Sequence, residues 1–154
     1  MELRELDPQD EQRVRAFVVA TAGASPEAWS WTPARIDREW RSVWSTLQLP
    51  VATILAEDEG RILGMVCCTI VPVDREPGAV ITNLCVTLPD RRRGIGRLLM
   101  LRAHDIARAA GARVAALQVA PTQQAAVQLY TALGYSPVKE SEDTMVMDLS
   151  GTTN

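Results

Sequence analysis

The chain has 154 residues, of which 47% are hydrophobic and 23% are charged, and its formal net charge at pH 7 is −3. This length and composition predict a single globular domain over residues 1–154. The sequence has no apolar run of the roughly 20 residues that a bilayer-spanning helix needs, and its charged N-terminus lacks the apolar stretch of a signal peptide. A general nucleic-acid binder would carry a basic face, so we expect a cytoplasmic protein with neither nucleic acid nor membrane as a partner.

Hydrophobic periodicity and turn residues predict the elements of the first half of the chain. Thr32 followed by Pro33 is typical of a helix start, and Pro50 ends that helix. Residues 58–60 predict a hairpin turn between two strands. The expected elements are a strand over 1–7, helices over 11–20 and 33–47, strands over 51–57 and 61–71, and a loop over 72–78.

The second half alternates strands with helices, which predicts a parallel strand pair joined by a right-handed crossover. Gly111 and Gly134 are suitable helix stops, and Thr122 is a suitable cap for the second helix. The expected elements are strands over 80–86, 112–119, 135–139 and 144–149, and helices over 98–110 and 122–133.

The three cysteines, Cys67, Cys68 and Cys85, and the single histidine, His104, do not predict a metal site. The cysteines are odd in number and lie in apolar runs, so we expect buried thiols in a reducing compartment. Cys67 and Cys68 are adjacent and should face opposite sides of a strand, and one histidine is too few for a typical zinc site. We expect His104 on the exposed side of its helix, without a chemical role.

The most informative segment joins the strand over 80–86 to the helix that follows it. Its sequence is Arg91, Arg92, Arg93, Gly94, Ile95, Gly96 and Arg97. Backbone N–H groups at a helix start lack intrahelical partners and bind anions, and the two glycines let a phosphate approach the backbone. The arginines add charge-assisted hydrogen bonds. The spacing is neither a Walker loop, which needs Gly-Lys-Ser/Thr, nor the dinucleotide fingerprint, which needs a third glycine.

A second pattern covers residues 125–135, a short helix with a Leu-Tyr pair that ends in Leu-Gly and an aromatic residue. By i, i+3 and i+4 spacing, one helical face carries Ala126, Leu129, Tyr130 and Leu133. Tyr130 is therefore expected to point inward among apolar neighbours.

Together the two patterns resemble the signatures of the GNAT acetyltransferases. Arg91, Gly94 and Gly96 fill the specified positions of that family's Arg/Gln-x-x-Gly-x-Gly/Ala loop, and residues 125–135 are similar to its second signature. The resemblance covers about residues 49–149. It implies an α/β (α+β) fold with one mixed, mostly antiparallel sheet of about six to seven strands, a parallel pair that splays apart, and about four flanking helices.

The resemblance also implies acetyl-CoA as the acyl donor, without a metal. Residues 91–97 would hold its pyrophosphate, and the backbone of Leu84, Cys85 and Val86 would pair with its pantetheine arm. The Val86 N–H would polarise the thioester carbonyl; the less favoured alternative is that Val86 is an ordinary strand residue. Gln123 stands where the family usually has an asparagine that contacts pantetheine.

Aromatic side chains have candidate roles on both sides of the reaction. Tyr130 would protonate the leaving thiolate, because a tyrosine hydroxyl is a neutral donor at pH 7; its alternative role is that of a core tyrosine. Trp29 and Trp31 lie in a loop and are candidates for the wall of an acceptor pocket. Trp40 and Trp44 lie one helical turn apart and are better suited to the core.

The acceptor would be an amine, and here the sequence departs from the family's protein-acetylating branches. Those branches carry a glutamate base at positions that correspond to Gln118 and to Val80 or its neighbourhood. A water held by Gln118, by Asn83 or by backbone carbonyls would carry the proton instead. We therefore expect a small-molecule primary amine, with peptide or protein N-terminal acetylation and a non-catalytic acyl-CoA-binding module as alternatives. Dimers are frequent among similar proteins, so a homodimer stays open.

Overall fold

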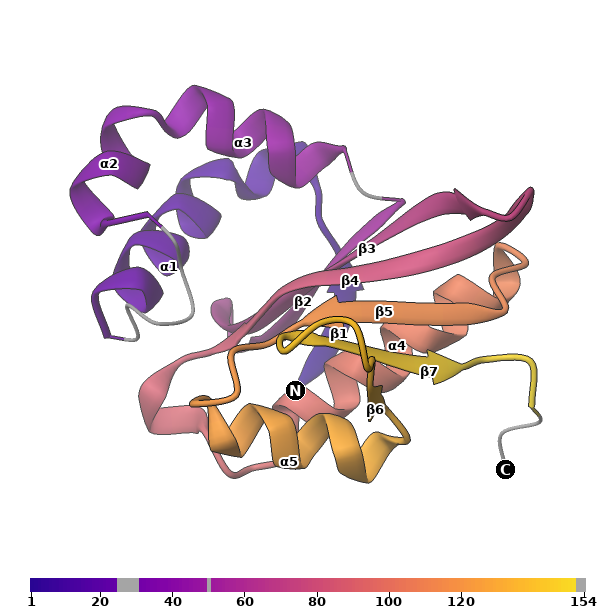
Figure 1. Ribbon diagram of the computed structural model, residues 1–154. Helices are drawn as coiled ribbons and strands as arrows, with labels where there is room; N and C mark the ends of the chain where they lie inside the picture. The colour runs from indigo at the N-terminus through magenta and orange to yellow at the C-terminus, as the bar shows by residue number, and fades with distance from the viewer. Residues whose placement is uncertain (25–30, 50, 152–154) are drawn as a thin grey trace.

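The computed structural model describes residues 1–24, 31–49 and 51–151, and its centre is one seven-stranded sheet in the order β1-β2-β3-β4-β5-β7-β6 (Figure 1). Neighbouring strands are antiparallel except β4 and β5, which are parallel. This confirms the mixed, mostly antiparallel sheet that the resemblance implies. The strands are β1 (Glu2–Glu5), β2 (Ala52–Asp58), β3 (Arg61–Val73), β4 (Glu76–Val86), β5 (Val114–Gln118), β6 (Ser136–Pro137) and β7 (Thr144–Asp148).

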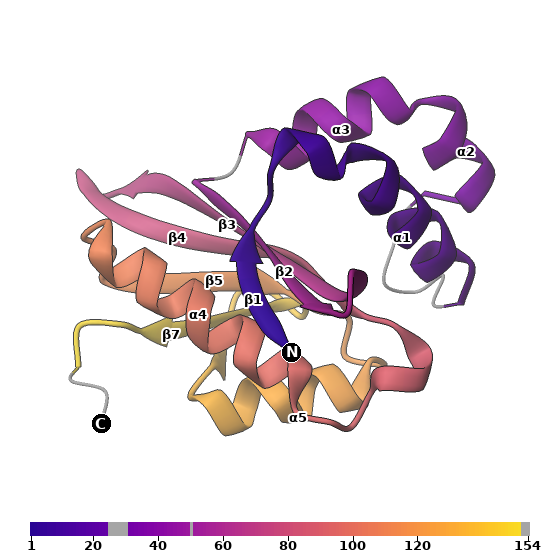
Figure 2. The ribbon, with the colours of Figure 1, turned by 180° about the vertical axis from the view of Figure 1, so that it is seen from behind.

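Helices cover both faces of the sheet. The helices α1 to α3 lie together on one face, and α4 and α5 lie on the other (Figures 1 and 2). No helix in the described ranges is long and apolar enough to cross a bilayer. The helices are α1 (Glu11–Ala24), α2 (Pro33–Arg38), α3 (Trp40–Gln48), α4 (Ile95–Ala109) and α5 (Gln124–Leu133), with short 3-10 turns η1 (Pro8–Asp10) and η3 (Leu88–Asp90).

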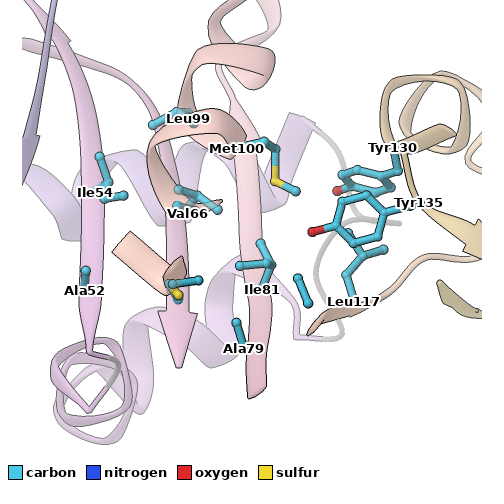
Figure 3. Packing of buried hydrophobic residues seen from close by; sticks show 14 of the residues in the cluster. Ala52, Ile54, Val66, Ala79, Ile81, Leu99, Met100, Leu117, Tyr130 and Tyr135 are labelled. Carbon is cyan, nitrogen blue, oxygen red and sulfur yellow. The ribbon is translucent and has the colours of Figure 1, made fainter. Parts of the chain in front are cut away.

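Each face of the sheet has its own hydrophobic core, because side chains alternate along the strands. On β2, Ile54 packs in the core under α4 and α5, whereas its neighbour Leu55 packs in the core under α1 to α3. Cys67 and Cys68 on β3 divide in the same way, and all three cysteines are buried, as expected from the sequence. Figure 3 shows the core that α4 and α5 cover.

The expectation of a loop over residues 72–78 is wrong, because β3 and β4 continue through this segment as a hairpin. Asp74 and Arg75 form its two-residue turn with φ values of 50° and 70°, which a type I′ turn requires. The residues that flank such a turn form a hydrogen-bonded pair, so Pro72 and Pro77 fall opposite each other at the next, non-hydrogen-bonded pair. A proline there removes no bond between the two strands, although prolines in sequence suggest a loop.

The helix expected over residues 33–47 is two helices. α2 and α3 meet at Glu39, whose φ of −104° and ψ of 28° are not helical. At this break the buried Trp40 indole donates to the Glu11 carboxylate on α1 at 3.1 Å, a tertiary contact that hydrophobic periodicity does not contain. The Trp40 and Trp44 rings stack with centroids 6.0 Å apart, and both pack in the core under α1 to α3, as predicted.

Candidate active site

The parallel strands β4 and β5 separate towards their C-terminal ends. Their pairing joins Ala79 with Ala115 and Val80 with Ala116. Beyond these pairs a cavity of about 500 Å³ opens between the strands. It is lined by Val80, Ile81, Thr82, Asn83, Ala116, Leu117, Gln118 and Thr144. The splayed pair that the resemblance implies is thus present, and two residues of the predicted acceptor side, Asn83 and Gln118, lie together on the cavity wall with Val80.

The backbone of Val86 faces this gap. The Thr87 N–H donates to the Leu63 carbonyl oxygen of β3 at 2.8 Å. Antiparallel pairs alternate between hydrogen-bonded and non-hydrogen-bonded, so the next pair, Val86 with Gly64, directs its N–H and C=O groups away from each other. The Val86 carbonyl accepts a hydrogen bond from the Arg91 Nε at 3.1 Å, as this orientation requires. The Val86 N–H is therefore turned towards the side on which β4 leaves β5.

A β-bulge interrupts the pairing of β3 with β4 beside the cavity. The register between β3 and β4 shifts between Met65 and Cys67, and the opposing Asn83 has a φ of 56°. Asparagine tolerates this left-handed conformation better than most residues. Bulges commonly redirect a side chain beside an active site. Here the Asn83 Nδ2 lies 3.6 Å from the Cys67 Sγ, which turns the amide towards the α1 to α3 face at the cavity wall.

Leu84 and Cys85 connect the bulge to Val86. The Leu84 side chain packs against the core under α4 and α5, and the Cys85 thiol is buried in the opposite core. Burial raises the pKa of the Cys85 thiol, so the thiol stays protonated. Of these two residues, the backbone is therefore the part suited to pairing with a ligand.

The glycine segment forms the start of α4. Gly94 is the N-cap in a left-handed conformation, with a φ of 80°, and no side chain caps the helix. The backbone N–H groups at Ile95, Gly96 and Arg97 point out of the first turn and lack intrahelical acceptors. A Cβ at Gly96 would lie 3.4 Å from a Leu129 methyl carbon on α5 and 4.0 Å from a Val86 methyl carbon. The absent side chain thus lets the helix start lie close to α5 and to the end of β4.

The four arginines of the segment have different surroundings. Arg91 is held against the Val86 carbonyl, and Arg93 is held by Asp90, whose Oδ1 lies 2.7 Å from the Arg93 Nη1. Arg92 and Arg97 are exposed beside the glycines, Arg92 with a φ of 66°. The segment is therefore partly anchored to the protein and partly directed to solvent, next to the free amides of α4.

Sequence reasoning missed Asp90, which organises this loop. Its buried carboxylate accepts hydrogen bonds from the Thr87 hydroxyl, from Arg93, and from Arg61 on β3 at 3.2 Å. The Thr87 hydroxyl, together with the Arg61 charge, holds the pKa of Asp90 below its ordinary value. From the sequence alone, an aspartate that follows a proline is expected to be an exposed turn residue. The contact with Arg61, which is distant in sequence, shows that Asp90 is instead a buried partner.

Tyr130 points inward from α5, as predicted, and is 8% exposed. Its ring makes an edge contact with the Tyr135 ring, with centroids 5.9 Å apart (Figure 3). Burial raises the pKa of Tyr130 to about 12, so its hydroxyl stays a proton donor in neutral solution. Both its suggested roles, acid and core residue, are compatible with this placement.

The expectation that His104 is exposed is wrong. Its side chain is buried, and its Nε2 lies 2.7 Å from the Tyr135 hydroxyl oxygen. On α4 it shares the inward face with Met100, Ala103 and Ala107, so helical periodicity places it inside although its polarity suggested otherwise. Burial, with a smaller effect of the Arg108 charge, lowers the pKa of His104 to about 4 and keeps the ring neutral.

Gln123 closes the turn before α5. Its side-chain oxygen accepts from the Ala120 N–H at 3.3 Å, and its own N–H donates to the Ala120 carbonyl at 2.9 Å. Gln123 rather than Thr122 is the N-cap of α5, so the predicted Thr122 cap is wrong. Its amide group lies in the loop that follows β5.

The structure describes one of the two tryptophans that were predicted to form the wall of an acceptor pocket. Trp31 is half-buried, packs against the core under α1 to α3, and carries the Arg35 guanidinium 4.0 Å above its ring centre. It is not among the residues that line the β4–β5 cavity. Trp29 lies outside the described residues. Within the described ranges, no group of three or more His, Cys, Asp or Glu side chains could hold a metal ion.

Solved structures share this architecture. A GNAT family acetyltransferase from Brucella melitensis, solved in complex with acetyl-CoA, is 18% identical with a TM-score of 0.71, over 99% of this chain and 90% of that chain. An acetyltransferase of the GNAT family from Staphylococcus aureus Mu50 is 11% identical with a TM-score of 0.77, over 97% and 99%. The ribosomal-protein-S18-alanine N-acetyltransferase from Escherichia coli is 18% identical with a TM-score of 0.71, over 99% and 96%.

Sequence comparison assigns the family. A search of curated proteins gives no significant match. The sequence profile of the acetyltransferase (GNAT) family matches residues 13–135, which include the bulged strand β4, the glycine segment and α5. The chain therefore belongs to the acetyltransferase (GNAT) family, whose enzymes transfer acyl groups from acyl-CoA.

Proposed function

We propose that this protein transfers an acetyl group from acetyl-CoA to the primary amine of a small molecule. The observation that carries the proposal is the position of the Val86 amide, which faces the gap between β4 and β5 directly beside the uncapped start of α4. If the anionic group of an elongated ligand binds at the start of α4, the rest of that ligand can therefore lie along the free edge of β4. The Brucella melitensis relative, solved in complex with acetyl-CoA, supports this choice of donor.

The glycine segment would bind the pyrophosphate of the donor. The N–H groups at Ile95, Gly96 and Arg97 and the positive end of the α4 dipole favour an anion there. Arg92 and Arg97 add positive charge at the surface, while Asp90 holds the loop through Arg93. The pantetheine arm would then run back along Leu84 to Val86 and bring the thioester to the cavity.

The reaction would be direct attack of the amine within a ternary complex. The amine nitrogen forms a bond with the thioester carbonyl carbon, and the developing oxyanion accepts a hydrogen bond from the Val86 N–H. The carbon–sulfur bond then breaks, and Tyr130 donates its hydroxyl proton to the departing thiolate. The proton lost by the amine returns to Tyr130 through water, so the products are the acetylated amine and free CoA.

The walls of the cavity favour a small molecule over a protein as the acceptor. Gln118 and Val80 occupy or adjoin the positions at which the protein-acetylating branches carry glutamate, and both residues line the cavity. The alternative acceptor is a protein N-terminus, since the Escherichia coli relative acts on the alanine of ribosomal protein S18.

Calorimetric titration with acetyl-CoA tests the donor, with free CoA and ATP as controls. We expect micromolar binding of acetyl-CoA and a much weaker response to ATP. Gly96→Asp should abolish this binding, because its Cβ would lie 3.4 Å from a Leu129 methyl carbon and its carboxylate would repel the pyrophosphate. Unaltered affinity in that variant would refute the assignment of the phosphate loop. A thiol-release screen with small amines and with peptide N-termini then separates the two acceptor classes.

A further inference from the structure

The cavity between β4 and β5 is built of uncharged side chains. Thr82, Asn83, Gln118 and Thr144 contribute hydroxyl and amide groups, and the other four lining residues are apolar. None of these eight side chains can take up a proton at neutral pH or balance the charge of an ammonium group. The wall thus offers hydrogen bonds to an amine but no countercharge.

Among the residues that the structure describes, the titratable groups of the neighbouring segments are also unsuited to act as a base. Burial raises the pKa of the Cys67 thiol, which lies behind Asn83, and burial keeps the Tyr130 hydroxyl protonated. The Asp143 carboxylate is exposed and is bound to the Ser141 hydroxyl at 2.8 Å. The other acidic side chains of the adjoining segments include Glu76, paired with Arg113 3.9 Å away at the opposite end of the strand pair, and Asp148, which accepts a hydrogen bond from the Ser150 N–H at 2.8 Å at that same end of β7. Glu140 and Glu142 are exposed, and Lys139 is a base only in its neutral form.

An amine must be neutral to attack a thioester, so these surroundings select acceptors by basicity. At pH 7.5, about one third of an α-amino group with a pKa of about 7.8 is neutral, against about 0.1% of a lysine ε-amine with a pKa of about 10.4. The described residues of the cavity supply neither a base nor a countercharge, so they do not compensate for that difference of about 250-fold in the neutral fraction.

Building on the proposed acetyl transfer, we propose that the acceptor is a weakly basic amine, such as the α-amino group of an amino acid derivative or an arylamine, and not an alkylamine or a lysine ε-amine. Such an amine enters the cavity in its neutral form, donates a hydrogen bond to the Gln118 or Asn83 amide oxygen, and attacks the thioester without a prior proton transfer to the protein. Its surplus proton leaves through water after the carbon–nitrogen bond has formed.

A matched pair of lysine amides tests this preference, one acetylated at Nε so that only the α-amine is free, the other acetylated at Nα so that only the ε-amine is free. The measurement is kcat/KM at pH 7.5 by thiol release, extended to a panel of amino acid amides and arylamines against alkylamines. We expect kcat/KM for the weakly basic amines to be at least about 50-fold higher. Equal or higher values for the strongly basic amines, or no turnover of any weakly basic amine, would overturn the proposal.

The pH profile supplies a second test that does not depend on how well each acceptor fits. Because no described residue of the cavity wall is a base, kcat/KM should level off near the pKa of each acceptor itself, about pH 8 for the α-amine and about pH 10 for the ε-amine. An inflection at one shared pH between 6 and 9 for both acceptors would reveal an enzyme base and overturn the proposal. Acetyl-CoA binding is measured on the same preparation: its absence would count against the proposed function, whereas binding with a preference for strongly basic amines overturns this inference alone.

Discussion

The Arg91 guanidinium donates to the Val86 carbonyl oxygen across 3.1 Å, and this bond ties the start of the glycine segment to the last residue of β4. Both residues belong to the proposed donor site, Arg91 near the pyrophosphate and Val86 beside the thioester. One hydrogen bond therefore helps to fix the distance between the two ends at which the donor would be held.

Arg91→Ala should weaken acetyl-CoA binding by about tenfold or more, because a hydrogen bond from a charged group contributes about 1.5–3 kcal/mol. The measurement is calorimetric titration of the purified variant. Arg102→Ala is the matched control, since it removes the same charge from an exposed position further along α4. Equal losses of affinity in the two variants would indicate a general charge effect and contradict a specific role for Arg91.

Tyr130→Phe should lower kcat by at least about tenfold and leave acetyl-CoA affinity within about threefold, because it removes a proton donor without changing the packing of the ring. Stopped-time thiol release gives kcat, and calorimetry gives the affinity. Tyr135→Phe serves as the comparison: it removes the hydroxyl bound to His104 and should lower stability with little effect on kcat. An unchanged kcat in Tyr130→Phe would make Tyr130 a core residue only.

The buried His104 should make the protein less stable in mild acid. Its pKa is about 4 in the folded protein, against about 6.5 for an ordinary histidine, so between these values the unfolded chain binds more protons. The free energy of unfolding should therefore fall by up to about 3 kcal/mol as the pH drops from 6.5 to 4, and this group should contribute no further loss below that range. Urea titrations at several pH values measure this free energy of unfolding.

The control for this effect is the double variant His104→Leu with Tyr135→Phe, which removes the titrating ring and the hydroxyl that it binds. Its free energy of unfolding should depend less steeply on pH between 4 and 6.5. The same slope in both proteins would show that His104 is not the group responsible.

Gln118→Glu should raise kcat/KM for lysine ε-amines at pH 7.5 by at least about tenfold, because a carboxylate on the cavity wall can accept a proton and attract an ammonium group. The weakly basic amines should gain much less. Gln118→Leu, of similar size, should lack this gain. If the glutamate variant acetylates ε-amines no faster than the native protein, Gln118 does not face the acceptor amine.

Local sequence patterns predicted much of the fold. The hairpin turn predicted at residues 58–60 is confirmed, and Glu59 and Gly60 form it with φ values of 51° and 76°. The period of 3.6 residues placed Tyr130 on the inward face of α5, and Gly134 ends that helix with a φ of 114°. These features succeed because they depend on neighbours within a few residues.

The errors occur where a distant contact overrides the local preference. Pro72 and Pro77 suggest a loop, but they form a non-hydrogen-bonded pair of the β3–β4 hairpin, so neither removes a bond between the strands. His104 read as a surface residue, but Tyr135 from the segment after α5 provides a buried partner for its ring. Periodicity along α4 is consistent with an inward His104, but neither the Tyr135 partner nor the strand register at the prolines can be read from local sequence.

The sequence by itself determined the family, the glycine turn at the start of α4 and the inward face of α5, because glycine positions and helical periodicity are properties of short segments. Only the tertiary structure decided that Val86 turns its amide towards the gap, that Asp90 anchors the loop through Arg61, and that Gln118 and Asn83 share one uncharged cavity. Each of these depends on strand register or on pairing between residues far apart in the chain. A shift of the register by one residue would turn the side chains of a strand to the opposite face of the sheet.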